Sequence, residues 1–255
     1  MSDPRAQGRR GPVVHFVVPF YNNESSLRAD IAALCGFLNR ASGEEYEVVL
    51  CNDGSTDASL AVAEDLEREF SALRVVGYDV NRGRGYAVRF AAGTCGGRFL
   101  IFADADLPRT TDLRHILTLR QRLDDHPVAV GSRFLRESGT RRFWTRNIVG
   151  RTHRFLAKIL FPRLNVTDPD VGFKGFDLAW LRKMNAISRM DRWSWDLEVL
   201  VIARANALSI AEIGIDWNER HEGHTSSVRL VRDAREEFAG MLAIRRNLRR
   251  GLYRL

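Results

Sequence analysis

Two aspartates follow directly after a hydrophobic run. The run is Phe99–Ala103, and the carboxylates are Asp104 and Asp106, at positions i and i+2. In a continuing strand, residues two apart face the same way, so both carboxylates would lie on one side. Carboxylate oxygens are the ligands that Mg²⁺ and Mn²⁺ prefer, and substrate phosphates can complete the coordination. The spacing therefore predicts a Mg²⁺ or Mn²⁺ site, with a solvated acidic turn as the alternative.

Polar motifs follow other expected strands as well. After the first strand, Tyr21 could stack on a base and Glu24 could accept a hydrogen bond from a base or ribose, although a turn and a helix cap explain both. After the second strand, Asp53 is well placed for a base or ribose, but Asn-Asp-Gly is also turn chemistry. Residues 81–87 read NRGRGYA, where glycines permit close backbone approach and a helix start favours anions. This string fits neither the P-loop nor the dinucleotide-binding spacing.

The middle of the chain is rich in arginine, whose planar guanidinium can donate two hydrogen bonds to one phosphate. Most of these arginines can be explained as the solvent-exposed face of a helix. The others are candidates for binding a substrate that carries several phosphates. They are Arg133, Arg136, Arg141, Arg142, Arg146, Arg151 and Arg154. Further on, Trp193 and Trp195 are candidates either for sugar stacking or for the core.

Alternating elements position these motifs. Hydrophobic runs typical of strands alternate with helical patterns, which predicts βαβ units and a largely parallel sheet. Ligands bind beyond the carboxyl ends of such strands, where the polar motifs lie. The runs are Val13–Val18, Tyr46–Leu50, Leu73–Tyr78, Phe99–Ala103 and Val128–Gly131, with a later short strand at Leu208–Ile213.

Composition narrows the class of protein. The chain has 255 residues, 45% hydrophobic and 28% charged, which predicts one globular domain. A net charge of +7 permits anionic partners without choosing among them. Three cysteines form neither a disulfide framework nor a zinc spacing, which favours a reducing compartment. The start lacks a signal-peptide core and no apolar run is long enough to span a membrane, so we expect a disordered arm at residues 1–11 and a chain that is soluble or rests on a membrane surface.

The last segment has a character of its own. Residues 229–255 contain eight arginines and no acid after Glu237. We expect a basic amphipathic helix, suited to an anionic membrane surface or a membrane-protein partner, with a core-packed last helix as the alternative. The apolar residues near one helical stripe are Phe238, Met241, Leu242, Leu248, Leu252 and Leu255.

The order of these motifs resembles glycosyltransferase family 2, and the resemblance covers roughly residues 12–228. Strings at residues 146–147, 168–176 and 192–198 are similar to the polyprenyl-phosphate branch, which contains dolichyl-phosphate glucosyltransferases and dolichyl-phosphate mannose synthases. The strings at residues 168–174, 192–198 and 215–219 are closer to the glucosyltransferases.

The resemblance implies an α/β fold of the GT-A type, with a Rossmann-like, mainly parallel central sheet flanked by helices. It implies a single catalytic domain at residues 12–228, followed by the C-terminal amphipathic helix at 229–255. Within the domain, residues 12–135 would form the nucleotide-sugar half and residues 136–228 the acceptor half.

The resemblance also assigns roles to individual positions. Asp104 and Asp106 would hold the metal and the donor diphosphate, Arg133 and Arg146 the lipid phosphate, and Asp196 and Glu198 would close the sugar side. The implied catalytic residues are Asp104, Asp106, Arg133, Asp196 and Glu198, and the implied nucleotide-sugar pocket is Pro19, Tyr21, Glu24, Asp53 and Asp104. Two features depart from the family. Mannose synthases often have a polar metal ligand directly after the two aspartates, whereas here Leu107-Pro108 offers no third metal ligand. The glucosyltransferases tend to have a lysine shortly after the glycine that corresponds to Gly223. No lysine stands there in this chain, which leaves the role of that lysine to His224, Arg229 or no residue.

The implied activity is an inverting, metal-dependent transfer of a hexose to a polyprenyl or dolichyl phosphate, at the cytoplasmic face of a membrane to which the protein binds peripherally. UDP-glucose is favoured over GDP-mannose as the donor. One alternative is a transferase acting on a soluble hydroxyl, which would need a base such as Asp170 or Asp196. Another is a basic nucleic-acid-binding or scaffold protein. Acidic strand-end motifs and the lack of a nucleic-acid-binding signature argue against a nucleic-acid partner.

Overall fold

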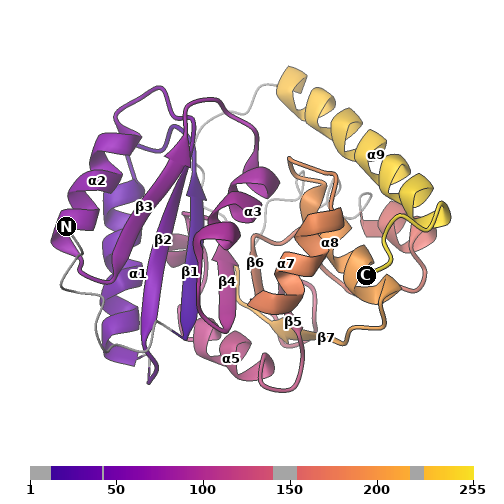
Figure 1. Ribbon diagram of the computed structural model, residues 1–255, viewed down its shortest axis with the longest axis horizontal. Helices are drawn as coiled ribbons and strands as arrows, with labels where there is room; N and C mark the ends of the chain where they lie inside the picture. The colour runs from indigo at the N-terminus through magenta and orange to yellow at the C-terminus, as the bar shows by residue number, and fades with distance from the viewer. Residues whose placement is uncertain (1–12, 42, 140–153, 219–226) are drawn as a thin grey trace, which may run out of the picture.

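A seven-stranded sheet forms the centre of the protein (Figure 1). The computed structural model describes residues 13–41, 43–139, 154–218 and 227–255, with only the backbone at 227–234. The strand order is β3-β2-β1-β4-β6-β5-β7, and β6 alone among these strands runs against the others. The strands are β1 (Val14–Phe20), β2 (Tyr46–Asp53), β3 (Leu73–Tyr78), β4 (Phe99–Ala103), β5 (Val128–Ser132), β6 (Phe173–Asp177) and β7 (Ile210–Gly214). The predicted α/β fold with a mainly parallel sheet is confirmed.

Helices lie in front of and behind the sheet in Figure 1, which explains why the central strands are continuous hydrophobic runs. The helix α3 packs across β1 and β2, and α7 packs against α3 and α8. The helices are α1 (Leu27–Ala41), α2 (Ser59–Glu69), α3 (Arg84–Thr94), α4 (Leu107–Thr110), α5 (His115–Arg122), α7 (Leu178–Ile187), α8 (Trp195–Ala205) and α9 (Ser227–Arg249). Residues 154–160 are helical as well.

One strand was not among those expected from the sequence. Residues 173–177 form β6, which pairs antiparallel with both β4 and β5. Gly175 is needed there because a Cβ would lie 2.9 Å from the Leu123 side chain. Lys174 is tolerated in a buried strand because Asp196, distant in sequence, neutralises it. The antiparallel direction brings the first residues of β6 to the edge where β4 and β5 end.

The C-terminal helix has a packed face and an exposed one. Met241 and Ile244 are buried and α9 packs on α8, as the core-packed alternative predicts. Phe238 and Leu242 are 44% and 47% exposed, as a lipid-facing helix would require. Within the described residues, we find no helix with the length and hydrophobicity to cross a membrane.

Candidate active site

One edge of the sheet gathers the expected functional residues. Tyr21, Asp53, Asp104 and Arg133 follow or end parallel strands there. Lys174 reaches the same edge from the start of the antiparallel strand β6. The topology therefore brings donor-side and acceptor-side motifs together, as the alternation of strands and helices predicts.

A buried network of four charged groups lies at this edge. The Nη1 of Arg84 donates to both carboxylate oxygens of Asp104 at 2.9 Å, and its Nη2 donates to Asp196. The Nζ of Lys174 donates to the other Asp196 oxygen at 2.5 Å and to the carbonyl of Val171. The side chains of Lys174 and Asp196 have no exposed surface, whereas Asp104 is 29% exposed. The two cations balance the two carboxylates, and Asp104 is the member most open to solvent.

The charges in this network stabilise one another. Burial opposes the charge of Arg84, but Asp104 and Asp196 outweigh it and raise the pKa of the guanidinium. Burial lowers the pKa of Lys174, and the nearby Arg84 lowers it further, while Asp196 partly offsets both effects. Both oxygens of the fully buried Asp196 accept from cations, so in this arrangement Asp196 serves as the counter-ion of Arg84 and Lys174. Sequence reasoning gave no role to Arg84 or Lys174, although both stand in strings that carry the family resemblance, at residues 81–87 and 168–176.

Asp106 has a different environment from Asp104. Within the described residues its carboxylate makes no hydrogen bond to another side chain. Burial, followed by repulsion from Asp104, raises its pKa to about 6, and the positive charge of Arg109 offsets this only in part. A divalent cation would relieve this repulsion, and two carboxylates supply the hard oxygens that Mg²⁺ or Mn²⁺ requires. The described residues contain no cluster of three potential metal-ligating side chains, so phosphate and water oxygens would complete the coordination. The two residues therefore fit the expected cation.

Gly172 shapes the position of Asp104. A Cβ on Gly172 would lie 1.8 Å from the Oδ2 of Asp104, which no ordinary packing permits. The backbone N–H of Asp104 donates to the Gly172 carbonyl at 2.8 Å. The carboxylate therefore lies directly against the backbone before β6, and only glycine leaves room for it.

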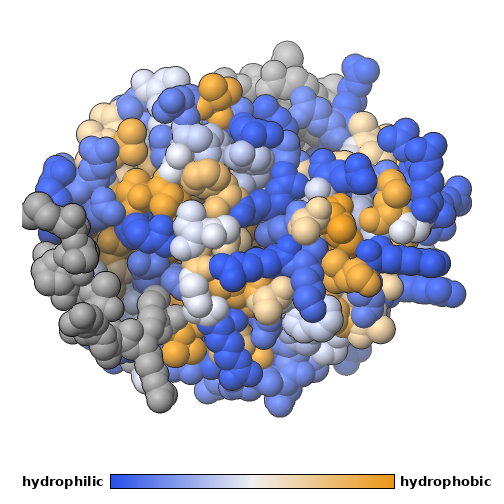
Figure 2. Space-filling model, in the orientation of Figure 1, coloured by the Kyte–Doolittle hydropathy of each residue, from blue (hydrophilic) through white to orange (hydrophobic). Residues whose placement is uncertain are grey.

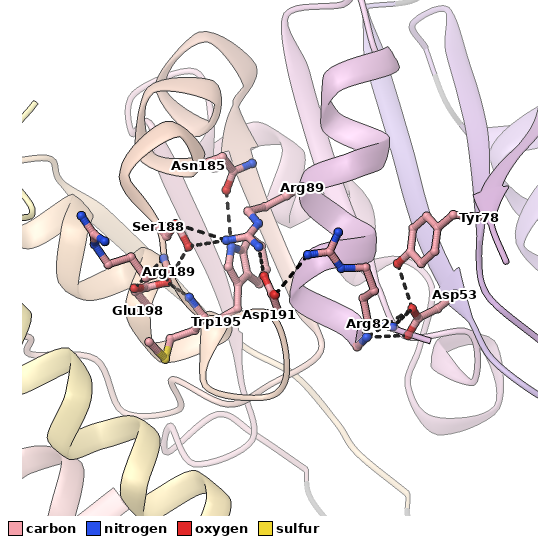
Figure 3. Close-up of polar contacts among 12 residues, drawn as sticks. Asp53, Tyr78, Arg82, Arg89, Asn185, Ser188, Arg189, Asp191, Trp195 and Glu198 are labelled. Carbon is pink, nitrogen blue, oxygen red and sulfur yellow. Dashed lines mark hydrogen bonds and ion pairs between the residues drawn. The ribbon is translucent and has the colours of Figure 1, made fainter. Parts of the chain in front are cut away.

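Asp53 organises the loop before α3. Its carboxylate accepts from the Tyr78 hydroxyl at 2.8 Å, from Asn81, and from the backbone N–H groups of Arg82 at 2.7 Å and Gly83 at 2.9 Å (Figure 3). Asp53 is only 4% exposed. Its contact with a nucleotide stays a prediction, and its visible task is to fix the loop beside the expected nucleotide pocket.

The other residues of the expected nucleotide pocket differ in how open they are. Tyr21 is 47% exposed and its ring is accessible, while Pro19 lies partly buried within β1. The Oε2 of Glu24 accepts from the backbone N–H of Ala58 at 2.9 Å, beside the start of α2. The structure thus shows Glu24 as a helix cap, the alternative considered for it, and its contact with a base or ribose stays a prediction.

The glycines of residues 81–87 accommodate the protein's own chain. A Cβ on Gly83 would lie 2.7 Å from the side chain of Arg192, and one on Gly85 would lie 2.3 Å from Trp195. The close approach that these glycines permit is therefore to the segment before α8. The two tryptophans there separate: Trp195 is buried against Phe102, whereas Trp193 is 52% exposed with its ring centroid 4.2 Å from the guanidinium carbon of Arg84.

Arg133 on the acceptor side is held in place by a buried acid. Its Nε and Nη2 donate to the two oxygens of Asp168 at 2.7 and 2.8 Å. Burial opposes the charge of Arg133, but Asp168 outweighs it and raises the pKa of the guanidinium. Arg146, the second residue expected at the acceptor phosphate, lies outside the described residues, as do His224 and the side chain of Arg229.

Glu198 lies in the interior, away from the edge of the sheet. Its carboxylate accepts from the Ser188 hydroxyl and from the backbone N–H groups of Arg189 and Met190 (Figure 3). It also accepts from the Tyr253 hydroxyl at 2.6 Å. The side chain is fully buried. Glu198 thus joins the loop after α7 to the C-terminal turn, so the structure shows a positioning task for this residue.

The sequence matches glycosyl transferase family 2 over residues 15–187. It is 30% identical to the glycosyltransferase AglD of Haloferax volcanii, over 90% of this chain and 36% of that protein. It is 34% identical to the dolichyl-phosphate beta-glucosyltransferase of Drosophila melanogaster, over 80% of this chain and 66% of that protein. The chain thus spans about a third of the first relative and just under two thirds of the second.

Solved structures share the fold. Glucosyl-3-phosphoglycerate synthase from Mycobacterium tuberculosis, in complex with Mn²⁺, UDP and glucosyl-3-phosphoglycerate, superimposes with a TM-score of 0.69 and 18% identity. The match covers 92% of this chain and 80% of that one. At this identity the likeness establishes the architecture, which confirms the expected GT-A type of fold.

Proposed function

Because the chain belongs to glycosyltransferase family 2, we propose that it transfers glucose from UDP-glucose to the phosphate of a polyprenyl lipid of the dolichyl type. Relatives from Drosophila melanogaster and Saccharomyces cerevisiae named dolichyl-phosphate beta-glucosyltransferase support this sugar and this acceptor. The mycobacterial synthase with the same fold was solved with UDP and Mn²⁺, which supports a uridine nucleotide and a divalent cation. GDP-mannose is the second candidate donor.

The observation that carries the proposal is the pair of Asp104 and Asp106. Asp106 is partly buried beside a second carboxylate, and among the described residues no side chain donates a hydrogen bond to it, so its surroundings favour a cation. We propose that both side chains hold Mg²⁺ or Mn²⁺, which supplies charge neutralisation for the diphosphate leaving group. Arg84 lies against Asp104 and is positioned to add a second positive charge near that group.

The state of Asp196 favours a phosphate acceptor over a hydroxyl. A hydroxyl must lose a proton to a base, and one of the two expected bases, Asp196, is fully buried with its oxygens held by Arg84 and Lys174. A hydroxyl acceptor would therefore depend on the other one, the partly buried Asp170. A phosphate monoester has its second pKa near ~6 and is already ionised at neutral pH, so it needs positioning rather than deprotonation. Arg133, aligned by Asp168, is the described residue that we assign to the acceptor phosphate, and Arg146 is its proposed partner.

The remaining roles follow from exposure. We assign the exposed ring of Trp193 to stacking on the sugar. Arg84 contacts this ring and also binds Asp196, so the ring lies beside the four-charge network where the sugar is expected. The exposed ring of Tyr21 is assigned to the base, with Pro19, Glu24 and Asp53 shaping the pocket. Direct attack of the acceptor on the sugar gives inversion, so an α-linked donor yields a β-linked product.

The exposed apolar residues of α9 support a peripheral membrane location. A polyprenyl chain resides in a bilayer, and Phe238 and Leu242 offer an apolar face beside the arginines of the same helix. We propose that α9 rests on the cytoplasmic face of the membrane, where a membrane-protein partner would also meet it.

The test is product identification. Purified protein with Mn²⁺ or Mg²⁺ is incubated with UDP-glucose, GDP-mannose and other nucleotide sugars, together with a short polyprenyl phosphate. We expect a hexosyl polyprenyl phosphate from UDP-glucose, found by product mass, and its loss in EDTA. Transfer to a soluble hydroxyl but not to the lipid phosphate would overturn the acceptor, and transfer from GDP-mannose alone would overturn the donor.

A further inference from the structure

A basic cavity of 790 Å³ lies away from the four-charge network. It is bounded by the C-terminal ends of α8 and α9 and by residues 161–164. Six of its fourteen lining residues are arginines and none is acidic. The arginines are Arg163, Arg204, Arg245, Arg249, Arg250 and Arg254.

Only one of these arginines has a visible structural task. The Nε of Arg204 donates to the carbonyl of Leu164 at 2.9 Å, which braces the end of α8. Within the part of the chain that the structure describes, the other five side chains make no hydrogen bond or ion pair with the protein. Five like charges around one cavity repel each other, and an anion with several oxygens would relieve that repulsion.

The wall of the cavity is apolar. Phe161, Leu164 and Val201 are buried beneath the arginines, and Leu248 is packed against the core. Close in sequence to the lining residues Phe161 and Arg254, Ile159 and Leu255 are 58% and 47% exposed. Figure 2 shows long hydrophilic side chains beside hydrophobic ones over the α9 end of the molecule. Arginines that can bind phosphate, next to an apolar wall, fit an amphiphilic ligand with a phosphate head group.

The orientation of α9 points the cavity toward the same side as its exposed apolar residues. Phe238, Leu242, Arg245 and Arg249 are spaced i, i+4, i+7 and i+11, so they share one helical face. The neighbouring face, with Met241 and Ile244, packs into the core. One face of α9 therefore carries exposed hydrophobic side chains and, further along, the arginines of the basic cavity. A helix at a bilayer surface needs both, because the apolar side chains enter the lipid and the arginines contact the anionic head groups.

We propose that this cavity binds the phosphate head group of an anionic membrane lipid. The inference goes beyond the proposed function, because no lining residue belongs to the network around Asp104 and the binding requires neither donor nor acceptor. Its failure would therefore leave the transfer reaction untouched, and loss of transfer activity would not affect it.

The experiment measures binding of the full chain to phosphatidylcholine vesicles with and without phosphatidylglycerol, by co-sedimentation without any nucleotide sugar. The cavity variant is Arg163→Gln with Arg249→Gln, taken from opposite walls. The matched control is Arg40→Gln with Arg122→Gln, two exposed arginines on α1 and α5 that make the same change in net charge. A second cavity variant, Arg250→Gln with Arg254→Gln, guards against a local defect in the first.

We expect the wild type to bind only the anionic vesicles, with affinity falling at high salt. Each cavity variant should lose roughly 30-fold in affinity, since each arginine near an anionic surface contributes several-fold, and the control should lose less than about threefold. An equal loss in control and cavity variants would show diffuse attraction and overturn the site. Calorimetric binding of inorganic pyrophosphate that depends on the same arginines, without vesicle binding, would overturn the lipid as the source of the phosphate.

Discussion

At the scale of single residues, Asp106 has a weaker counter-charge than Asp104. Asp104 is held by two hydrogen bonds from Arg84, whereas burial and repulsion from Asp104 act on Asp106 and Arg109 offsets them only in part. A partly buried carboxylate without a hydrogen-bonded cation among the described residues costs stability, and functional sites commonly retain such groups because a ligand completes them.

We therefore predict that Asp106→Asn lowers Mn²⁺ affinity at least about tenfold and abolishes transfer, while the midpoint of thermal unfolding stays the same or rises, because repulsion from Asp104 is removed. Mn²⁺ affinity is measured by calorimetry and unfolding by circular dichroism. Asp125→Asn, at an exposed position after α5, is the control and should change neither quantity. Unchanged Mn²⁺ affinity in Asp106→Asn would contradict the metal assignment.

The buried pair of Lys174 and Asp196 gives a second prediction. Lys174→Met leaves Asp196 in the interior with Arg84 alone, and removing one partner of a buried ion pair costs about 3–5 kcal/mol of unfolding free energy. The double variant Lys174→Met with Asp196→Asn should be less destabilised than the sum of the two single variants, by more than about 1 kcal/mol. Urea unfolding of the four proteins measures this coupling, and strictly additive losses would show that the two groups act independently.

These residues also show how far sequence reasoning reaches. Asp104 and Asp106 could be predicted because they directly follow a buried strand, and strand ends meet at one edge of a parallel sheet. Arg84 and Lys174 could not, because their shared partner Asp196 is 112 and 22 residues away. Asp53 and Glu24 were predicted at the right edge, but whether their carboxylates face a ligand or the backbone depends on loop geometry that residue types do not determine.

At the scale of elements, one ion pair and several hydrogen bonds between neighbouring strands hold the nucleotide side together. Glu47 of β2 accepts from His15 Nδ1 of β1 at 3.0 Å and from Nη2 of Arg74 of β3 at 3.0 Å. The Nε2 of the same histidine accepts from the backbone N–H groups of Gly96 and Gly97, just before β4. Burial would raise the pKa of Glu47, but the hydrogen bonds from His15 and Arg74 outweigh it and lower the pKa to about 2.

A depressed carboxylate pKa stabilises the fold above the ordinary pKa of 4.5, and that stabilisation is lost as the pH falls toward 2. Glu47→Gln should therefore lower the free energy of unfolding by roughly 2 kcal/mol at pH 7, with a difference from wild type that shrinks between pH 4.5 and 2. Urea titrations across this range measure the difference. The exposed Glu64→Gln on α2 is the control, and a gap for Glu47→Gln that does not change with pH would refute the strand-linking role.

The element that sequence reasoning missed was β6. Its sequence, with a lysine and a glycine among aromatic residues, does not alternate between apolar and polar residues, so it lacks the pattern by which strands are predicted. Its pairing partners, β4 and β5, precede it by tens of residues. The consequence is large, because β6 lies between strands of the first half and joins them to β7 through β5. The nucleotide-sugar and acceptor halves expected from the sequence therefore share one sheet.

At the scale of the whole molecule, the site and the exposed face of α9 belong to one body. The helix α9 packs on α8, and α8 begins with Trp195 and Asp196 at the network. Glu198 of α8 also holds the C-terminal Tyr253. A membrane contact at α9 would thus orient the active site relative to the bilayer in which a polyprenyl chain resides.

The last prediction separates that orienting role from catalysis. Phe238→Ser with Leu242→Ser removes apolar side chains that are 44% and 47% exposed, so the midpoint of thermal unfolding should not fall. Transfer to a long-chain polyprenyl phosphate in vesicles should fall at least about tenfold, because burying each of these side chains in lipid contributes roughly 1.5–3 kcal/mol. Transfer to a short, water-soluble acceptor should be unchanged, since the four-charge network is intact. Leu60→Ser, a 38% exposed position on α2, is the matched control and should leave both rates unchanged. Equal losses with both acceptors would mean that this face of α9 serves the fold or the chemistry, because a contact with the bilayer affects only the acceptor that resides there.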